Sequence, residues 1–73
     1  MYKNRITVDP EIMLGKPIIV GTRITVEAIL KKLSDGYSVD EVVEIFPTLR
    51  KDDILVALAY SADVIGREEM IVG

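Results

Sequence analysis

Residues 25–65 read TVEAILKKLSDGYSVDEVVEIFPTLRKDDILVALAYSADVI, and apolar side chains recur along this stretch at the three- and four-residue spacing of α-helices. Two breaks divide the stretch. A glycine at position 36 suits the end of a first helix, and a proline at position 47 stops a second one. The pattern therefore predicts three helices joined by short connections, of which the third is the longest.

The predicted helices have identifiable ends. Thr25 is suited to cap the first helix, and Ser38 with Glu41 has the spacing of a capping box at the start of the second. The third helix is expected to begin near residue 50 and to end at about residue 65, before a second glycine. Helix, turn, helix, turn and longer helix is the layout of a three-helix bundle that contains a helix-turn-helix.

Each predicted helix has an apolar face that should form the core. The faces are Val26, Ile29, Leu30 and Leu33; then Val39, Val42, Val43 and Phe46; then Ile54, Ala57, Leu58, Ser61, Ala62 and Ile65. Further apolar residues widen the third face almost around the helix. Two interpretations stay open for this helix, a central core helix and an interface with a partner.

The first 24 residues predict a short β ribbon. Residues 6–8 alternate apolar and polar before Asp9-Pro10 ends the strand, and residues 17–20 and 23–24 are extended pieces separated by a turn at Gly21. So small a ribbon is marginal alone, and pairing with a second chain would stabilise it. We therefore expect one domain over residues 1–73, made of a ribbon (1–24), a bundle (25–66) and a tail (67–73) that frays or packs on a partner.

Composition excludes much catalytic chemistry. The 73 residues include no cysteine and no histidine, which removes disulfides, Cys/His zinc sites and thiol or Ser-His nucleophiles. Adjacent acids at positions 52–53 and 68–69 would point about 100° apart on a helix and could not share a metal or a proton. We expect no enzyme activity, no catalytic residues, no metal and no cofactor.

Charge is divided unevenly along the chain. Residues 1–33 carry a net charge of +3 and residues 34–73 one of −6, for a total of −3, so any contact with double-stranded DNA must use a local basic patch. In a helix-turn-helix the start of the third helix would face the major groove, although nearby acids oppose it. Arg23 has the alternative of an internal salt bridge to Glu27. The candidate nucleic-acid contacts are Arg5, Arg23, Lys31, Lys32, Thr48, Arg50 and Lys51.

Apolar content points to a partner chain. Apolar residues make up 49% of the sequence and the mean hydropathy is +0.31, which is high for a chain whose surface is large relative to its volume. We expect a homodimer joined through the ribbon and the third helix, with candidate interface residues Ile6, Val8, Ile18, Val20, Leu55, Ala59 and Tyr60. The longest apolar run, residues 54–60, is too short to span a membrane, and no signal stretch follows the first charges, so we expect a cytoplasmic protein.

Three segments resemble a known family: RITVDPE at residues 5–11, GKPIIVGTRI at residues 15–24 and ILVALAY at residues 54–60. They are similar to the bacterial and archaeal family described as domain of unknown function 433. The resemblance implies a homeodomain-like helix-turn-helix behind a short β ribbon. It also implies an antitoxin of the VapB type, because such proteins are commonly encoded beside a PIN-like toxin. Relatives often have a Thr-Pro capping pair where this chain has Arg50-Lys51.

These observations lead to one fold class and two functional hypotheses. The expected fold is mainly α, a three-helix homeodomain-like helix-turn-helix bundle preceded by a short N-terminal β ribbon. The leading hypothesis is an antitoxin that neutralises a PIN-like ribonuclease toxin and represses its own promoter. The alternative is a free-standing DNA-binding transcriptional regulator.

Overall fold

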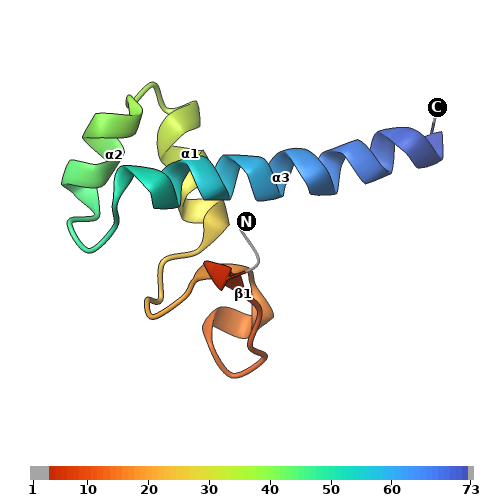
Figure 1. The fold of residues 1–73 in the computed structure, drawn as a ribbon, viewed down its shortest axis with the longest axis horizontal. Coiled ribbons are helices and arrows are strands. Elements are labelled where there is room, and N and C mark those ends of the chain that lie inside the picture. The colour runs from red at the N-terminus through yellow and green to blue at the C-terminus, as the bar shows by residue number, and fades with distance from the viewer. Residues whose placement is uncertain (1–3, 73) are drawn as a thin grey trace.

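The computed structural model describes residues 4–72, with side chains described for residues 4–67. In chain order its elements are strand β1 (Ile6–Thr7), the 3₁₀ turn η2 (Met13–Gly15), strand β2 (Ile18–Ile19) and helices α1 (Val26–Ser34), α2 (Val39–Ile45) and α3 (Lys51–Val72). Figure 1 shows α3 crossing the two shorter helices and extending well beyond them, with the ribbon beneath. The predicted class, a mainly α three-helix bundle behind a short N-terminal ribbon, is confirmed.

The ribbon is a two-stranded antiparallel sheet. Ile6 lies opposite Ile19, and Thr7 lies opposite Ile18. The extended piece predicted at residues 23–24 forms no strand, and this part of the chain meets β2 through an isolated bridge between Ile18 and Thr25. A sheet this short is marginal by itself, so burial of its isoleucines in the core holds it in place.

Both predicted helix caps are confirmed. The Thr25 hydroxyl accepts a hydrogen bond from the Ala28 N–H at 2.9 Å and so begins α1. At α2 the Ser38 hydroxyl accepts from the Glu41 N–H at 3.1 Å, and the Glu41 carboxylate accepts from the Ser38 N–H at 2.8 Å. These bonds satisfy backbone donors that the first helical turn leaves unpaired.

The core forms where the three helices meet the ribbon. Its buried apolar side chains are Ile6, Ile19, Val26, Ile29, Val42, Leu49, Ile54 and Ala57. The apolar faces predicted for the first two helices are confirmed, because their remaining members pack against this cluster. On α3 the prediction is partly wrong: Ile54 and Ala57 are fully buried, whereas Leu58, Ala62 and Ile65 are exposed.

α3 is also longer than predicted. It runs through Gly66 to Val72, so residues 67–72 of the predicted tail are helical, while residues 1–3 and 73 lie outside the described part of the chain. A glycine inside a helix costs only about 1 kcal/mol relative to alanine. Gly66 does not take the left-handed backbone that ends a helix, and good helix formers such as arginine and glutamate follow it.

Replacing each of two glycines, Gly36 after α1 and Gly66 within α3, by alanine should change stability in opposite directions. Gly36 follows α1 with φ +101°, and no atom lies within 4 Å of where a Cβ would be, so Gly36→Ala should cost about 1 kcal/mol through backbone strain alone. Gly66 has a helical backbone and equally open surroundings, so Gly66→Ala should stabilise by about 0.5–1 kcal/mol. Urea unfolding of both variants checks the signs, and destabilisation by Gly66→Ala would contradict this account of α3.

Candidate partner and nucleic-acid interfaces

The turn between α2 and α3 brings together three of the predicted nucleic-acid contacts. Thr48, Arg50 and Lys51 are all exposed, while Leu49 between them is buried in the core and anchors the turn. A buried leucine flanked by exposed polar residues holds this turn rigidly against the bundle. The geometry therefore presents these three side chains on the surface at the start of α3.

Arg5 lies beside this turn, but its side chain is held by a bond within the chain. Its Nη1 donates to Asp53 Oδ1 at 2.7 Å, so the guanidinium is engaged within the chain. The other carboxylate oxygen, Asp53 Oδ2, accepts from the Arg50 N–H at 2.9 Å. Asp53 thus caps the first turn of α3 from within the helix, which compensates for the missing capping pair at Arg50-Lys51. In the sequence this cap is indicated only by the position of Asp53 three residues after Arg50, which is the spacing of a capping box.

The remaining basic candidates are scattered. Arg23 is exposed in the loop that follows β2, and Lys31 and Lys32 lie in the last turn of α1. Lys32 Nζ is 5.7 Å from the centre of the Tyr37 ring, a cation–π contact that holds it at the helix end. The structure therefore groups the three residues of the α2–α3 turn and brings Arg5 beside them through Asp53.

Carboxylates surround that turn. Lys51 Nζ lies 3.9 Å from Asp40 Oδ1, and Asp40 and Glu41 occupy the first turn of α2. Asp52 is exposed beside Lys51 at the start of α3. These negative charges weaken the attraction of the turn for a phosphate backbone.

The predicted partner contacts divide into buried and exposed residues. Ile6 and Ile18 are both buried within the chain and so are not available to a partner, and this part of the prediction is wrong. Ile6 packs in the cluster that the ribbon forms with the three helices. Val8 and Val20 are exposed on the ribbon, and Leu55 and Ala59 are exposed on α3. Tyr60 is half-buried and lines a pocket.

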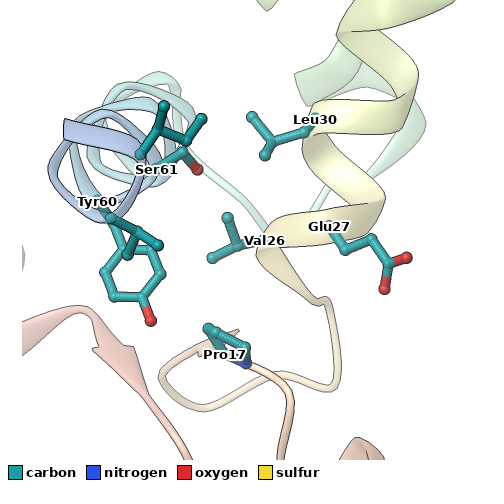
Figure 2. Close-up of a pocket in the computed structure, with 8 residues that line it drawn as sticks. Pro17, Val26, Glu27, Leu30, Tyr60 and Ser61 are labelled. Atoms are coloured by element: carbon teal, nitrogen blue, oxygen red, sulfur yellow. The ribbon is translucent and has the colours of Figure 1, made fainter. Parts of the chain in front are cut away.

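This pocket, of about 330 Å³, opens between α1 and α3. Figure 2 shows Val26 and Leu30 reaching from α1 toward Tyr60 and Ser61 on α3, with Pro17 of the ribbon segment below them. The Glu27 carboxylate points away from the interior. The lining is almost entirely apolar and consists of Pro17, Val26, Glu27, Leu30, Tyr60, Ser61, Val64 and Ile65. Sequence reasoning did not predict this pocket.

An ion pair lies at the rim of the pocket. Lys16 Nζ donates to Glu27 Oε1 at 2.7 Å, so Glu27 pairs with Lys16 rather than with the predicted Arg23. This hydrogen bond and the attraction of the ammonium group, with a smaller contribution from Lys31, hold the pKa of Glu27 below its ordinary value.

Lys16→Met is expected to raise the pKa of Glu27 toward its ordinary value, as measured by NMR titration of the Glu27 carboxyl carbon. Because folding lowers this pKa, the pair stabilises the protein above the unfolded pKa of about 4.3, and the stabilisation is lost as pH falls through the folded pKa. Lys51→Met removes a different lysine, beside Asp40, and should leave the Glu27 titration unchanged. An unaltered pKa in Lys16→Met would contradict the assignment.

Two classes of site are not found in the described part of the chain. No group of three or more acidic side chains is placed to hold a metal ion there. No helix over the same residues has the length and apolar content required to cross a membrane.

Comparison with known proteins identifies relatives. The family model for proteins of unknown function, DUF433, matches residues 6–61. An uncharacterised protein of Sinorhizobium fredii, y4eO, is 32% identical over 56 residues, which is 77% of this chain but 25% of that protein, so the chain spans a quarter of this relative's length. The crystal structure of a DUF433 member from Anabaena variabilis has a TM-score of 0.81 at 24% identity, covering 97% of this chain and 71% of the other, and shows the same fold.

Proposed function

Since the chain belongs to the DUF433 family, we propose that it acts by binding another protein, as the antitoxin of a pair whose toxin is a PIN-like ribonuclease. In this proposal the protein acts by binding and carries out no catalysis. Its proposed location is the cytoplasm. The observation that carries the proposal is the apolar pocket between α1 and α3, which suits an apolar segment of a partner.

The pocket has the character of a protein-binding groove. Val26 and Leu30 of α1 and Val64 of α3 line it. Helix pairs of this kind receive apolar side chains of a partner helix or strand. The Lys16–Glu27 pair at the rim adds polar groups of both signs beside the apolar interior, as in many protein interfaces. A volume of about 330 Å³ has room for a few apolar side chains rather than a whole helix.

Co-expression with the product of the neighbouring gene, which this proposal expects to be a PIN-like ribonuclease, tests the proposal. The two proteins should co-purify, and the chain should inhibit the ribonuclease. Val64→Glu places a charge in the pocket and should weaken inhibition at least about 100-fold, since burying an unpaired carboxylate is costly. The matched control is Val8→Glu on the exposed ribbon, which should inhibit like the natural chain. Absence of binding, or full inhibition by a folded Val64→Glu, would refute the proposal.

The α2–α3 turn supports a second candidate function, DNA binding by the antitoxin itself or by a free-standing regulator. Thr48, Arg50 and Lys51 are exposed at the position where a helix-turn-helix contacts DNA. An Arg50→Ala, Lys51→Ala double variant should bind the DNA upstream of the gene more weakly and with a salt dependence lower by about two counterions. The control is Arg67→Ala, far along α3. A flat titration with the natural chain excludes this function.

A further inference from the structure

α3 carries a second apolar surface on the side away from the core. Leu55, Leu58 and Ile65 are 49%, 38% and 52% exposed, and Ala59 and Ala62 between them are also exposed. We call these five residues the outer stripe. Positions 55, 58, 62 and 65 are separated by three, four and three residues, which is the spacing of the a and d positions in a coiled coil. No charged residue lies within the stripe.

The far half of α3 is poorly supported by the rest of the chain. Its 22 residues span about 33 Å. Among the side chains of α3 that the structure describes, residues 51–67, the last fully buried one is Ala57, and Figure 1 shows the C-terminal half of the helix projecting past the other helices and the ribbon. A helical segment without tertiary contacts is only marginally stable in water. Contact with a second copy would therefore stabilise the part of α3 that lies beyond its contacts with α1.

The exposed area matches the size of one protein interface. The chain exposes 5248 Å², whereas a compact monomer of 8.1 kDa exposes about 4500 Å². The excess of about 750 Å² is close to the roughly 800 Å² that each partner contributes to a stable complex. The exposed side chains of the outer stripe are part of this surface.

We propose that the outer stripe pairs with the same stripe of a second copy, with the two α3 helices antiparallel. A twofold axis at the level of position 60 then places Leu55 of each copy against Ile65 of the other, and Leu58 against Ala62. One twofold axis produces both contacts. A surface that pairs with its own copy in this way is self-complementary. The small Ala62 of each copy faces the large Leu58 of the other, so these layers interdigitate.

Parallel pairing fits less well. It would place Ala62 against Ala62 and leave a gap beside the leucine layers. It would also set the two projecting ends side by side without support. In the antiparallel pair the projecting end of each α3 lies along the anchored half of the other, so the outer stripe of each copy is covered.

The dimer surface and the pocket use different sides of α3. At about 100° per residue, Tyr60 and Val64 lie on the side facing α1, whereas Leu55, Leu58 and Ala62 face away from it. Only Ile65 borders both surfaces. Self-association therefore leaves the pocket interior in place, and it can be measured on the isolated chain without a toxin or DNA, so its failure is distinguishable from that of the proposed function.

The first experiment is the mass in solution, measured by light scattering and sedimentation equilibrium at micromolar concentrations. The natural chain should be a dimer, and Leu58→Glu should be a monomer with an unchanged circular dichroism spectrum over the bundle. The matched control is Val20→Glu on the exposed ribbon, which should remain dimeric. A monomeric natural chain, a dimeric Leu58→Glu or a monomeric Val20→Glu would each overturn the proposal, the last by assigning the interface to the ribbon.

The second experiment fixes the orientation and does not require a destabilising charge. The chain has no cysteine, so single cysteines report contacts cleanly. Leu55→Cys and Ile65→Cys, mixed and oxidised, should form a mixed disulfide. Leu55→Cys alone should not, because its two copies lie about 15 Å apart along the helices, beyond the roughly 7 Å limit for Cα atoms. Efficient disulfide formation by Leu55→Cys alone would show parallel pairing and refute the antiparallel arrangement.

Discussion

An Ile54→Ala variant is expected to lose about 3–4 kcal/mol of unfolding free energy in urea denaturation at a fixed protein concentration. Ile54 is fully buried at the start of α3, in the cluster where α1, α2 and the ribbon meet. Alanine would remove most of the side chain and leave a cavity that surrounding helices fill only in part. The loss is a large share of the about 5–15 kcal/mol that stabilises a small domain.

Two matched substitutions separate burial from other effects of changing an isoleucine. Ile54→Val removes one methylene group and should cost about 1 kcal/mol. Ile45→Ala makes the same chemical change on α2, where the side chain is partly exposed, and should cost about 1 kcal/mol or less. If Ile45→Ala destabilised as strongly as Ile54→Ala, the position of the core would be wrong.

Asp53→Ala is expected to cost about 2–3 kcal/mol, the second-largest effect. The carboxylate accepts charge-assisted bonds from Arg5 and from the Arg50 N–H, and its side chain is only 11% exposed. Both bonds would be lost, and the first turn of α3 would lose its cap. The Arg5 side chain is 39% exposed and can be rehydrated, which keeps the cost below that of a fully buried ion pair.

Neighbouring variants test that interpretation by chemical unfolding. Asp52→Ala changes the adjacent, exposed carboxylate and should cost less than about 0.5 kcal/mol. Asp53→Asn keeps an oxygen that can accept from the Arg50 N–H, so its cost should lie between those of the two alanine variants. A double-mutant cycle with Arg5→Ala should give a coupling of about 1 kcal/mol. Equal losses of unfolding free energy in Asp52→Ala and Asp53→Ala would show that the Asp53 carboxylate does not stabilise the start of α3.

The beginnings of α1 and α2 could be predicted because short-range contacts decide them. Thr25 meets the Ala28 N–H, and Ser38 exchanges two bonds with Glu41, all within three residues along the chain. The end of α3 could not be predicted in this way. A glycine at position 66 is compatible with both a helix end and a helix interior, and the residues after it favour the interior.

The sequence predicted less about the candidate nucleic-acid surface, the partner contacts and the pocket than about the helices. Residue type groups Arg5 with the other cations, but its partner Asp53 is 48 residues away in the sequence. Strand character suggested that Ile6 and Ile18 contact a partner, but both are buried within the chain itself, Ile6 in the cluster with the helices. The pocket has no sequence signal, because it depends on the separation of two helices and on where Pro17 lies beneath them.

By itself, the sequence determined the number of helices, the capped beginnings of α1 and α2, and the buried faces of those two helices. Each depends on hydrogen bonds and apolar spacing within one or two helical turns. Only the tertiary structure decided which side of α3 is covered. That helix is apolar almost all round, so its own pattern could not select the buried side; the position of α1, α2 and the ribbon selects it and leaves Leu55, Leu58 and Ile65 on the surface.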